Sequence, residues 1–268
     1  MVIVTITKNS SKTISDTIRS LENQTYKNIK WVIIDENSED NTLKIIKASK
    51  LKKEIIKTNK KGIFVCYNEI IKILKKRYLN DIIFFLHSDD ILFNNNTLLN
   101  ISNIFKNHKI FALCGNVVFF KKNKNDIFRK WISNYPKKQI KIKGQLYKFR
   151  NFYKRDFLFG WSFPHTSFFF HTKIINQIPY YDHKLKTSSD YGWTIKILLK
   201  NQFNIYYLNK NIIRMRAGGT STNLKNLILQ SVNDFKIIKK IFYNNFFDYF
   251  YCLVILFFKK FAKLKQFL

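Results

Sequence analysis

The chain has 268 residues, 46% of them hydrophobic and 17% aromatic, which is enough to bury a core in one large domain or two small ones. Its seven glycines and three prolines exclude a collagen-like or low-complexity protein. The net charge of +31 is typical of proteins that bind nucleic acid, anionic membranes or other polyanions. The lysines are nevertheless spread among Asn, Ile and Phe, which share AT-rich codons, so genome composition explains part of this charge equally well.

The cysteines and the N-terminus carry no targeting or metal-binding pattern. Cys66, Cys114 and Cys252 are far apart and lack CxxC spacing, so we expect free thiols in a reducing compartment. The N-terminus has neither a basic region nor a long apolar core, so we expect no signal peptide. The longest apolar stretch, Tyr249–Phe258, is about half of the ~20 residues that a membrane-spanning helix needs. We therefore expect a cytoplasmic protein.

Short apolar runs alternate with amphipathic segments over the first 120 residues. This alternation predicts an α/β fold, with a mostly parallel central sheet flanked by helices on both faces. The expected strands are Val2–Thr7, Lys30–Asp35, Glu54–Thr58, Asp81–Leu86 and Ile110–Phe120. The expected helices are Thr13–Asn23, a helix after Asp40, Ile63–Lys76 and Thr97–Asn107.

The pattern weakens over residues 121–150, which are rich in lysine and predict a variable connection or small insertion. Further strands are expected at Thr166–Phe170, Asn204–Leu208 and Asn211–Arg216, and helices at Thr172–Ile178, Asp190–Asn201 and from Asn223 onward. We therefore expect a catalytic domain over residues 1–222 and a helical C-terminal extension over residues 223–268.

Acidic side chains follow two of the expected strands at the point where each strand ends. Asp89 and Asp90 follow one apolar strand, and Asp35 ends another. Ligands of such sheets bind at the carboxyl ends of the strands, and Mg²⁺ binds through carboxylates and substrate phosphates. Taken alone, the Asp89–Asp90 pair could simply be a turn that caps the next helix. After Asp35, however, Ser38 and Asp40 can cap the next helix, so capping leaves Asp35 unexplained. The two clusters together predict a metal–diphosphate site beside a nucleoside pocket.

Several ordered motifs resemble family 2 glycosyltransferases, which have the Rossmann-like GT-A fold. The resemblance rests on Ser20–Tyr26, on Asp35–Thr42, and on Phe84–Asp90, which is similar to the family's metal motif with His87 in place of Asn. It continues more weakly at Ser188–Trp193, similar to the catalytic-base segment, and at Arg216–Ser221, similar to a loop of enzymes that build bacterial surface polysaccharides. It spans roughly residues 1–240.

The resemblance implies an inverting transfer of a sugar from a nucleotide-diphosphate donor, with UDP the best guess, to an acceptor hydroxyl. The acceptor would be a glycan or lipid-linked intermediate of lipopolysaccharide, capsule or exopolysaccharide synthesis. Asp190 would be the general base, and Asp90 with Asp89 would hold Mn²⁺ or Mg²⁺. The donor would contact Thr7, Asn9, Asp35, Ser38, Lys61, Gly62, Asn68, Ser88, Asp89, Arg216, Gly218 and Gly219.

Two further residues are expected on the acceptor side, His165 and Trp193. A simple packed histidine is the alternative for His165. For Asp190 the alternative is a first-turn helix residue that interacts with the helix dipole.

One departure from the family pattern leaves other functions open. Two positions before and within the third helix that are often acidic are Lys60 and Val65 here. These two replacements leave open an unusual donor preference. They also leave open that the chain is a non-catalytic relative that acts as a scaffold. A nucleic-acid-binding protein would leave the acidic strand ends without purpose, so we expect no nucleic acid partner. A nucleotidyltransferase would need a Gly-rich phosphate loop, and none follows the first strand.

The C-terminal residues 246–268 are densely apolar and then carry a lysine cluster at Lys259, Lys260, Lys263 and Lys265. An aromatic-rich helix with such a cluster suits the surface of an anionic membrane. We therefore expect peripheral association with the inner face of the plasma membrane. The alternative is a helix that packs on the catalytic domain or on a second subunit, as in a homodimer.

Overall fold

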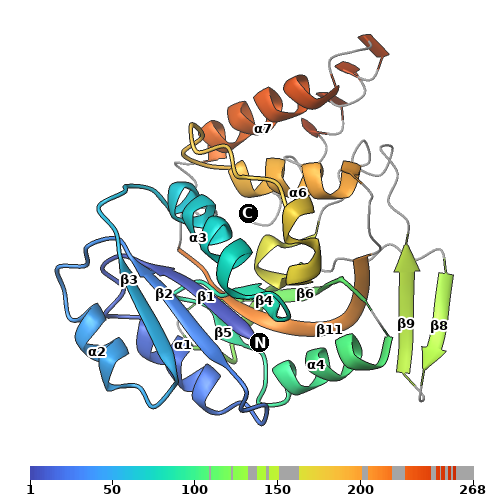
Figure 1. Cartoon of the computed structure of the whole chain (residues 1–268). Coiled ribbons are helices and arrows are strands. Elements are labelled where there is room, and N and C mark those ends of the chain that lie inside the picture. Colours follow the sequence, from blue (N-terminus) through green and yellow to red (C-terminus); the bar gives the residue numbers. More distant parts are fainter. Residues whose placement is uncertain are drawn as a thin grey trace.

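The computed structural model describes residues 1–108, 110–121, 123–131, 138–142, 145–150, 163–200, 205–218, 227–242, 246–247, 249–250, 253–254 and 256–257. It confirms the expected α/β fold, in which helices cover both faces of one curled, largely parallel sheet (Figure 1). Cys252, Gly219 and the C-terminal lysine cluster lie outside the described residues.

The parallel half of the sheet is formed by β1 (Val2–Thr7), β2 (Lys30–Asp35), β3 (Lys53–Lys57) and β4 (Ile82–Phe85), in the order β3-β2-β1-β4. The register places Thr7 opposite Asp35 and Asp35 opposite Lys57. The carboxyl ends of these strands are therefore level, and the polar residues that follow them meet at one edge of the sheet.

The second half of the sheet continues this edge. β10 (Phe168–His171) is antiparallel to both β4 and β6 (Ala112–Phe120), so β6 runs in the same direction as β4. β11 (Ile205–Arg216) is parallel to β6, and Arg216 pairs with Phe120 at the end of both strands. The carboxyl ends of β6 and β11 therefore lie at the same edge as Thr7.

Short antiparallel strands complete the sheet. β5 (Ile91–Leu92) pairs with β11, and β7 (Ile127–Trp131) pairs with β6. A hairpin of β8 (Lys138–Ile142) and β9 (Gln145–Arg150) joins the far edge through β11.

Two layers of helices bury the two faces of the sheet, because side chains alternate along each strand. Val2 and Val4 point into the core under α3 (Ile63–Arg77), and Ile3 points into the opposite core. The first layer also holds the 3₁₀ helices η1 (His165–Ser167) and η2 (Thr172–Gln177) and the helix α6 (Ser189–Lys200). The second layer holds α1 (Ile14–Glu22), α2 (Thr42–Ala48) and α4 (Thr97–His108).

The structure corrects several sequence-based expectations after residue 85. Residues 121–150 carry three strands, β7 to β9, where an unpatterned connection was expected; on β7 only alternate residues are half-buried, which leaves a weak apolar signal. The two expected strands at 204–208 and 211–216 are one strand, β11, with register shifts between Leu208 and Ile213. β5 has two residues and is too short for a periodic pattern. The segment Thr172–Gln177 is a 3₁₀ helix.

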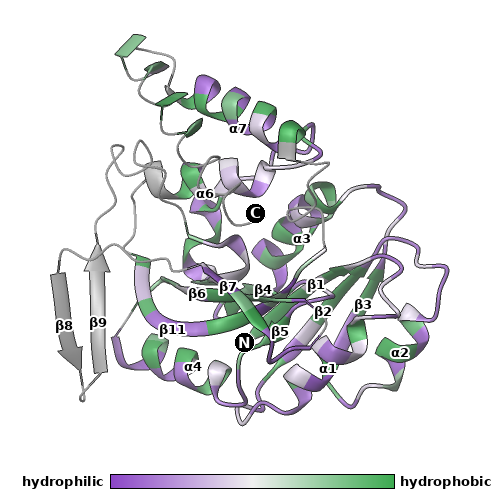
Figure 2. Cartoon of the chain, turned by 180° about the vertical axis from the view of Figure 1, so that it is seen from behind, coloured by the Kyte–Doolittle hydropathy of each residue, from purple (hydrophilic) through white to green (hydrophobic). Residues whose placement is uncertain are grey.

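The helix α7 (Leu227–Phe242) belongs to the expected C-terminal extension and packs outside α6 (Figure 1). Its Ile237 and Ile238 join the core under α3, while Ile228 stays 78% exposed. Apolar and polar residues alternate around this helix in Figure 2. Within the described part of the chain, no helix combines the length and apolar character needed to cross a membrane.

Candidate active site

Hydrogen bonds tie together the loops that follow β1 and β2. Asp35 is fully buried, and its carboxylate accepts bonds from the main-chain N–H and the hydroxyl of Ser38, at 2.9 and 2.6 Å. The Ser38 hydroxyl in turn accepts a bond from the N–H of Asn9. Asn9 has a φ of 48°, which asparagine tolerates better than most residues. Thr7 lies just beneath, and its buried hydroxyl has no partner among the described residues.

The start of α3 forms the next wall of the site. Gly62 has a φ of 107°, a conformation that glycine adopts without a steric cost, and its N–H donates to Glu36 at 3.0 Å. Lys61 is exposed beside it. Lys60, at one of the positions that lacks the family's acid, forms an ion pair with Glu69 at 2.9 Å.

Asn68 of α3 is half-buried, and its expected contact with the donor stays a prediction. Its side-chain amide donates to the carbonyl of Tyr181 at 3.0 Å and accepts from the N–H of Tyr181 at 2.7 Å. The Asn68 amide therefore anchors α3 to the segment that carries Tyr181.

Three side chains after β4 form the group best suited to hold a metal ion. One ligand atom from each of His87, Asp89 and Asp90 lies within 4.8 Å of the other two. Ser88 is fixed by a 2.9 Å hydrogen bond to Ser10, and Thr17 of α1 donates to the carbonyl of Asp90 at 2.8 Å. The loop after β1 and the helix α1 thus position the group.

Electrostatics at this group favour a bound cation. Burial raises the pKa of Asp90 well above its ordinary range, and the neighbouring Asp89 carboxylate raises it further. Burial lowers the pKa of His87, which keeps the imidazole in the neutral form that can ligate a metal. Asp90 Oδ2 is buried without a hydrogen-bond partner among the described residues, and His87 Nδ1 lies 3.5 Å from it. A divalent cation would satisfy this oxygen and stabilise the ionised carboxylate.

The donor set narrows the choice of metal. Carboxylates suit Mg²⁺ and Mn²⁺, whereas imidazole is a softer ligand than the oxygen atoms that Mg²⁺ prefers. The combination of one histidine and two aspartates therefore fits Mn²⁺ better than Mg²⁺.

Asp190 lies in the first turn of α6 and faces the same space. Burial lowers the pKa of His87, and the carboxylates of Asp89 and Asp190 oppose this shift, so Asp190 lies within electrostatic range of His87. Burial raises the pKa of Asp190 itself. The turn before it is held by Asn233 of α7, whose amide donates to the carbonyl and the hydroxyl of Thr187 at 3.2 and 3.0 Å.

An aromatic layer lies beneath the metal-binding group. Tyr67 stacks on Tyr181 at a centroid distance of 4.9 Å, and Tyr181 stacks on Trp193 at 5.0 Å. Trp193 is 1% exposed and donates to a main-chain carbonyl, and His165 is buried with Nε2 against the Tyr181 hydroxyl. Burial lowers the pKa of His165 to about 3. His165 and Trp193 are thus packed against each other in this layer, and a role of either residue on the acceptor side stays a prediction.

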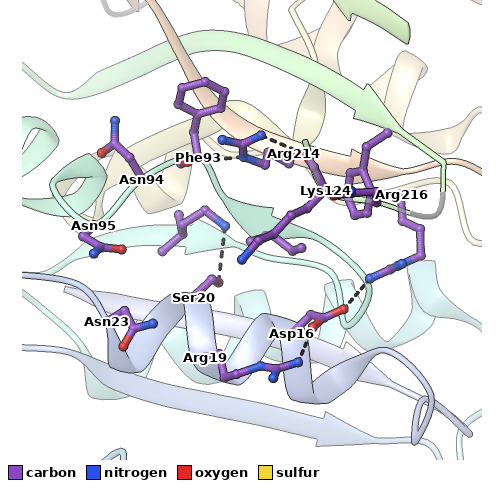
Figure 3. A pocket seen from close by; sticks show the side chains of 14 residues that line it. Asp16, Arg19, Ser20, Asn23, Phe93, Asn94, Asn95, Lys124, Arg214 and Arg216 are labelled. Carbon is purple, nitrogen blue, oxygen red and sulfur yellow. Dashed lines mark hydrogen bonds and ion pairs between the residues drawn. The ribbon is translucent and has the colours of Figure 1, made fainter. Parts of the chain in front are cut away.

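Arg216 reaches the site through its main chain, whose hydrogen bond to the Asp90 carboxylate lowers the pKa of Asp90, and through its charge. The charge contributes to lowering the pKa of Asp90, but the guanidinium pairs with Asp16 at 2.6 Å and stacks over the ring of Phe120. The side chain therefore points into a separate pocket beside α1 (Figure 3). Gly218, with a φ of 101°, follows it on the loop.

Sequence reasoning missed several residues that build the site. Ser10 and Thr17 carry an ordinary helix-start pattern, and Tyr67 and Tyr181 belong to apolar runs without a functional motif. Asp16 is three residues from Arg19, a spacing that is typical of a surface ion pair.

A curled, largely parallel sheet with carboxylates and a group suited to hold a metal at its strand ends is consistent with the GT-A fold. Residues 2–174 match the model of the glycosyl transferase family 2. This match covers more than half of the chain, which therefore belongs to that family. Among curated proteins, no sequence matches the chain.

Solved structures show the same fold at low sequence identity. S. aureus TarS is 20% identical with a TM-score of 0.62, and the match covers 87% of this chain and 39% of TarS. The TarS fragment 1–349 in complex with UDP-GlcNAc is 19% identical, with a TM-score of 0.62 over 89% of this chain and 66% of the fragment. The mannosyltransferase PcManGT from Pyrobaculum calidifontis, in complex with GDP-Man and Mn²⁺, is 12% identical, with a TM-score of 0.58 over 91% of this chain and 64% of that one. The chain thus spans less than two thirds of the length of each of them.

Proposed function

We propose that this chain is an inverting, metal-dependent glycosyltransferase that moves a sugar from a nucleotide-diphosphate donor to an acceptor hydroxyl. The observation that carries the proposal is the group of His87, Asp89 and Asp90 directly after β4, at the carboxyl end of the parallel strands. The Asp190 carboxylate lies close enough to this group to affect the pKa of His87. UDP is the favoured nucleotide, because one structure with a similar fold is the TarS fragment 1–349 in complex with UDP. A surface glycan or its lipid-linked precursor is the proposed acceptor, met at the inner face of the membrane.

The chain's own residues would bind the nucleoside, hold the metal ion and take up a proton. Asp35, Ser38 and the start of α3 would bind the nucleoside, where Gly62 allows close approach of the main chain. His87, Asp89 and Asp90 would hold Mn²⁺, which when bound neutralises charge on the diphosphate.

Asp190 would take the proton of the acceptor hydroxyl. The new bond forms between this oxygen and the anomeric carbon, while the bond from that carbon to the diphosphate breaks and the nucleoside diphosphate leaves with the electron pair. Because the carboxylate must be ionised to act, the raised pKa of Asp190 places the acid limb of the rate above the range of an ordinary aspartate.

Thermal unfolding with a panel of nucleotide sugars, with and without Mn²⁺, tests the proposal. A donor at ~100 times its Kd stabilises the fold by roughly 2.7 kcal/mol, which raises Tm by roughly 5–10 °C for a chain of this size. We expect this shift for one donor with Mn²⁺ present, and its loss in Asp90→Asn. The exposed Asp126→Asn is the matched control and should keep the shift.

Asp190→Asn separates binding from chemistry. It should keep the donor-induced shift and lose transfer by about 10²-fold or more, since general-base catalysis contributes about that much. The scaffold alternative predicts instead that folded wild-type protein shows no shift with any donor in the presence of metal.

A further inference from the structure

A second pocket of about 440 Å³ lies at the same edge of the sheet, beside α1 and away from the nucleoside loops (Figure 3). The chain that runs from Asp90 into β5 forms the wall between this pocket and the metal-binding group. Thr17 of α1 donates to the carbonyl of Asp90, and the N–H of Leu92 donates to Ser20 at 3.3 Å. Hydrogen bonds within the fold therefore hold the wall of the pocket in place, and the pocket is separate from the proposed donor site.

The lining of this pocket is strongly cationic. Among the described residues, the lining contains the four basic side chains Arg19, Lys124, Arg214 and Arg216 and one carboxylate, Asp16. Asp16 is already shared, since it lies 2.6 Å from both Arg19 and Arg216. Among the described residues, no carboxylate lies within ion-pair distance of Lys124, whose ammonium reaches into the pocket in Figure 3. The lining thus keeps a net positive charge inside a concave surface, which attracts anions.

The arginines are held in place before any ligand arrives. Arg214 lies over the ring of Phe93 at 4.3 Å and donates to the carbonyls of Phe93 and Lys124 at 3.3 and 2.8 Å. Arg216 lies over the ring of Phe120 at 4.7 Å, and its buried Nε has no hydrogen-bond partner among the described residues. Guanidinium groups fixed in this way lose little conformational entropy when they bind an oxyanion.

We infer that this pocket binds the phosphate group of a phosphomonoester or phosphodiester ligand. Phosphate matches the site because it offers several acceptor oxygens to cationic donors that converge from α1, from the residues after β6 and from the end of β11. Side-chain amides of Asn23, Asn94 and Asn95 line one end, where they can bond the hydroxyl groups that flank such a phosphate. The phosphate comes either from a soluble phosphodiester or from the headgroup of a membrane lipid.

Calorimetric titration of the full chain with inorganic phosphate and with glycerophosphoglycerol, at fixed ionic strength and without metal or nucleotide, tests this inference. The double variant Arg19→Gln/Lys124→Gln should weaken binding by at least about ten-fold, since each removes a charge-assisted bond. Both side chains are exposed, so the fold should tolerate the change. Lys44→Gln/Lys47→Gln on α2 removes the same charge from exposed positions and should change affinity less than about two-fold.

Phosphatidylglycerol vesicles distinguish the two sources of phosphate. If the pocket takes a lipid headgroup, the Arg19/Lys124 variant also binds these vesicles more weakly than the Lys44/Lys47 variant. If the ligand is soluble, the two variants bind vesicles with equal affinity. The Arg19/Lys124 variant then still binds glycerophosphoglycerol more weakly than the Lys44/Lys47 variant. The inference is overturned if wild-type protein shows no saturable phosphate binding, or if both variants lose it equally. These results are independent of the donor site, because neither metal nor nucleotide is present.

Discussion

Asp90 and His165 lie in neighbouring buried layers, and burial shifts their pKa values in opposite directions. It raises the pKa of the carboxyl group and lowers that of the imidazole, because in each case the low-dielectric surroundings favour the neutral form. A bound cation would lower the pKa of Asp90 again, because it stabilises the ionised carboxylate. Among the described residues, aromatic rings, the Tyr181 hydroxyl and the imidazole of His87 surround His165; burial first and then the charge of His87 lower its pKa, so it stays neutral.

The neutral state of His165 predicts a pH-dependent stability. The folded-state pKa is about 3, against ~6.5 in the unfolded chain, so only the unfolded chain takes up this proton as pH falls from 6.5 towards 3. Stability is therefore lost on acidification, and between pH 7 and 5 this residue alone accounts for about 2 kcal/mol. Asp90 and Asp190 have raised pKa values and contribute with the opposite sign, so the effect must be measured as a difference.

Urea unfolding of wild type and His165→Gln at pH 7 and pH 5 isolates that difference. We expect the variant to be less stable at pH 7 but to lose about 2 kcal/mol less on going to pH 5. The exposed His183→Gln should follow the wild type. An equal loss in wild type and His165→Gln would show that His165 does not resist protonation in the folded state.

At the scale of elements, the N-terminal half could be predicted from the sequence because local pattern and tertiary environment agree there. β1 and β2 were expected at their observed bounds, since both are continuous apolar runs buried on two faces. Asp89 and Asp90 of the group that could hold a metal were expected from the sequence as strand-end acids, and their metal binding stays a prediction; the proximity of His87 to them was not expected. The strands β7 to β9 were not expected either, because this lysine-rich segment has a weak apolar pattern. The pocket beside α1 depends on contacts 200 residues apart, such as Asp16 with Arg216.

The helix α7 helps to hold the turn before Asp190, although no local sequence motif indicates this role. Asn233 is 5% exposed and bonds to Thr187, three residues before Asp190, so this helix fixes the turn that presents the proposed base. Asn233→Ala would leave the Thr187 carbonyl buried without its partner, at a cost of about 1–3 kcal/mol. We expect this loss in urea unfolding, together with a fall in the transfer rate at saturating donor.

The exposed Asn103→Ala on α4 is the matched control, because it makes the same change on a helix surface and should be neutral within about 0.5 kcal/mol. If Asn233→Ala were as stable as this control, the bonds to Thr187 would not hold the turn.

The whole molecule combines a net charge of +31 with exposed apolar side chains in its C-terminal part. Ile228 at the start of α7 and Phe246, Phe247 and Phe250 beyond its end are 59–79% exposed. Basic proteins that expose aromatic rings in this way partition to anionic membranes, since charge attracts them and the rings enter the interface. The described part of the extension thus packs on the catalytic core at Ile237 while it keeps apolar groups outside.

Vesicle sedimentation tests whether this surface binds membranes. We expect binding to vesicles that contain phosphatidylglycerol, weaker binding as salt shortens the Debye length to roughly 3 Å at 1 M, and little binding to neutral vesicles. Replacing Phe246, Phe247 and Phe250 with serine should lower the affinity at least about ten-fold, because each ring contributes roughly 1 kcal/mol or more when it leaves water. The matched control replaces Leu79, Phe111 and Phe128, which are 41–73% exposed elsewhere on the molecule. If neither triple variant lost affinity, the charge of the whole chain would bring it to the membrane, and an equal loss in both would mean that no particular apolar surface is responsible.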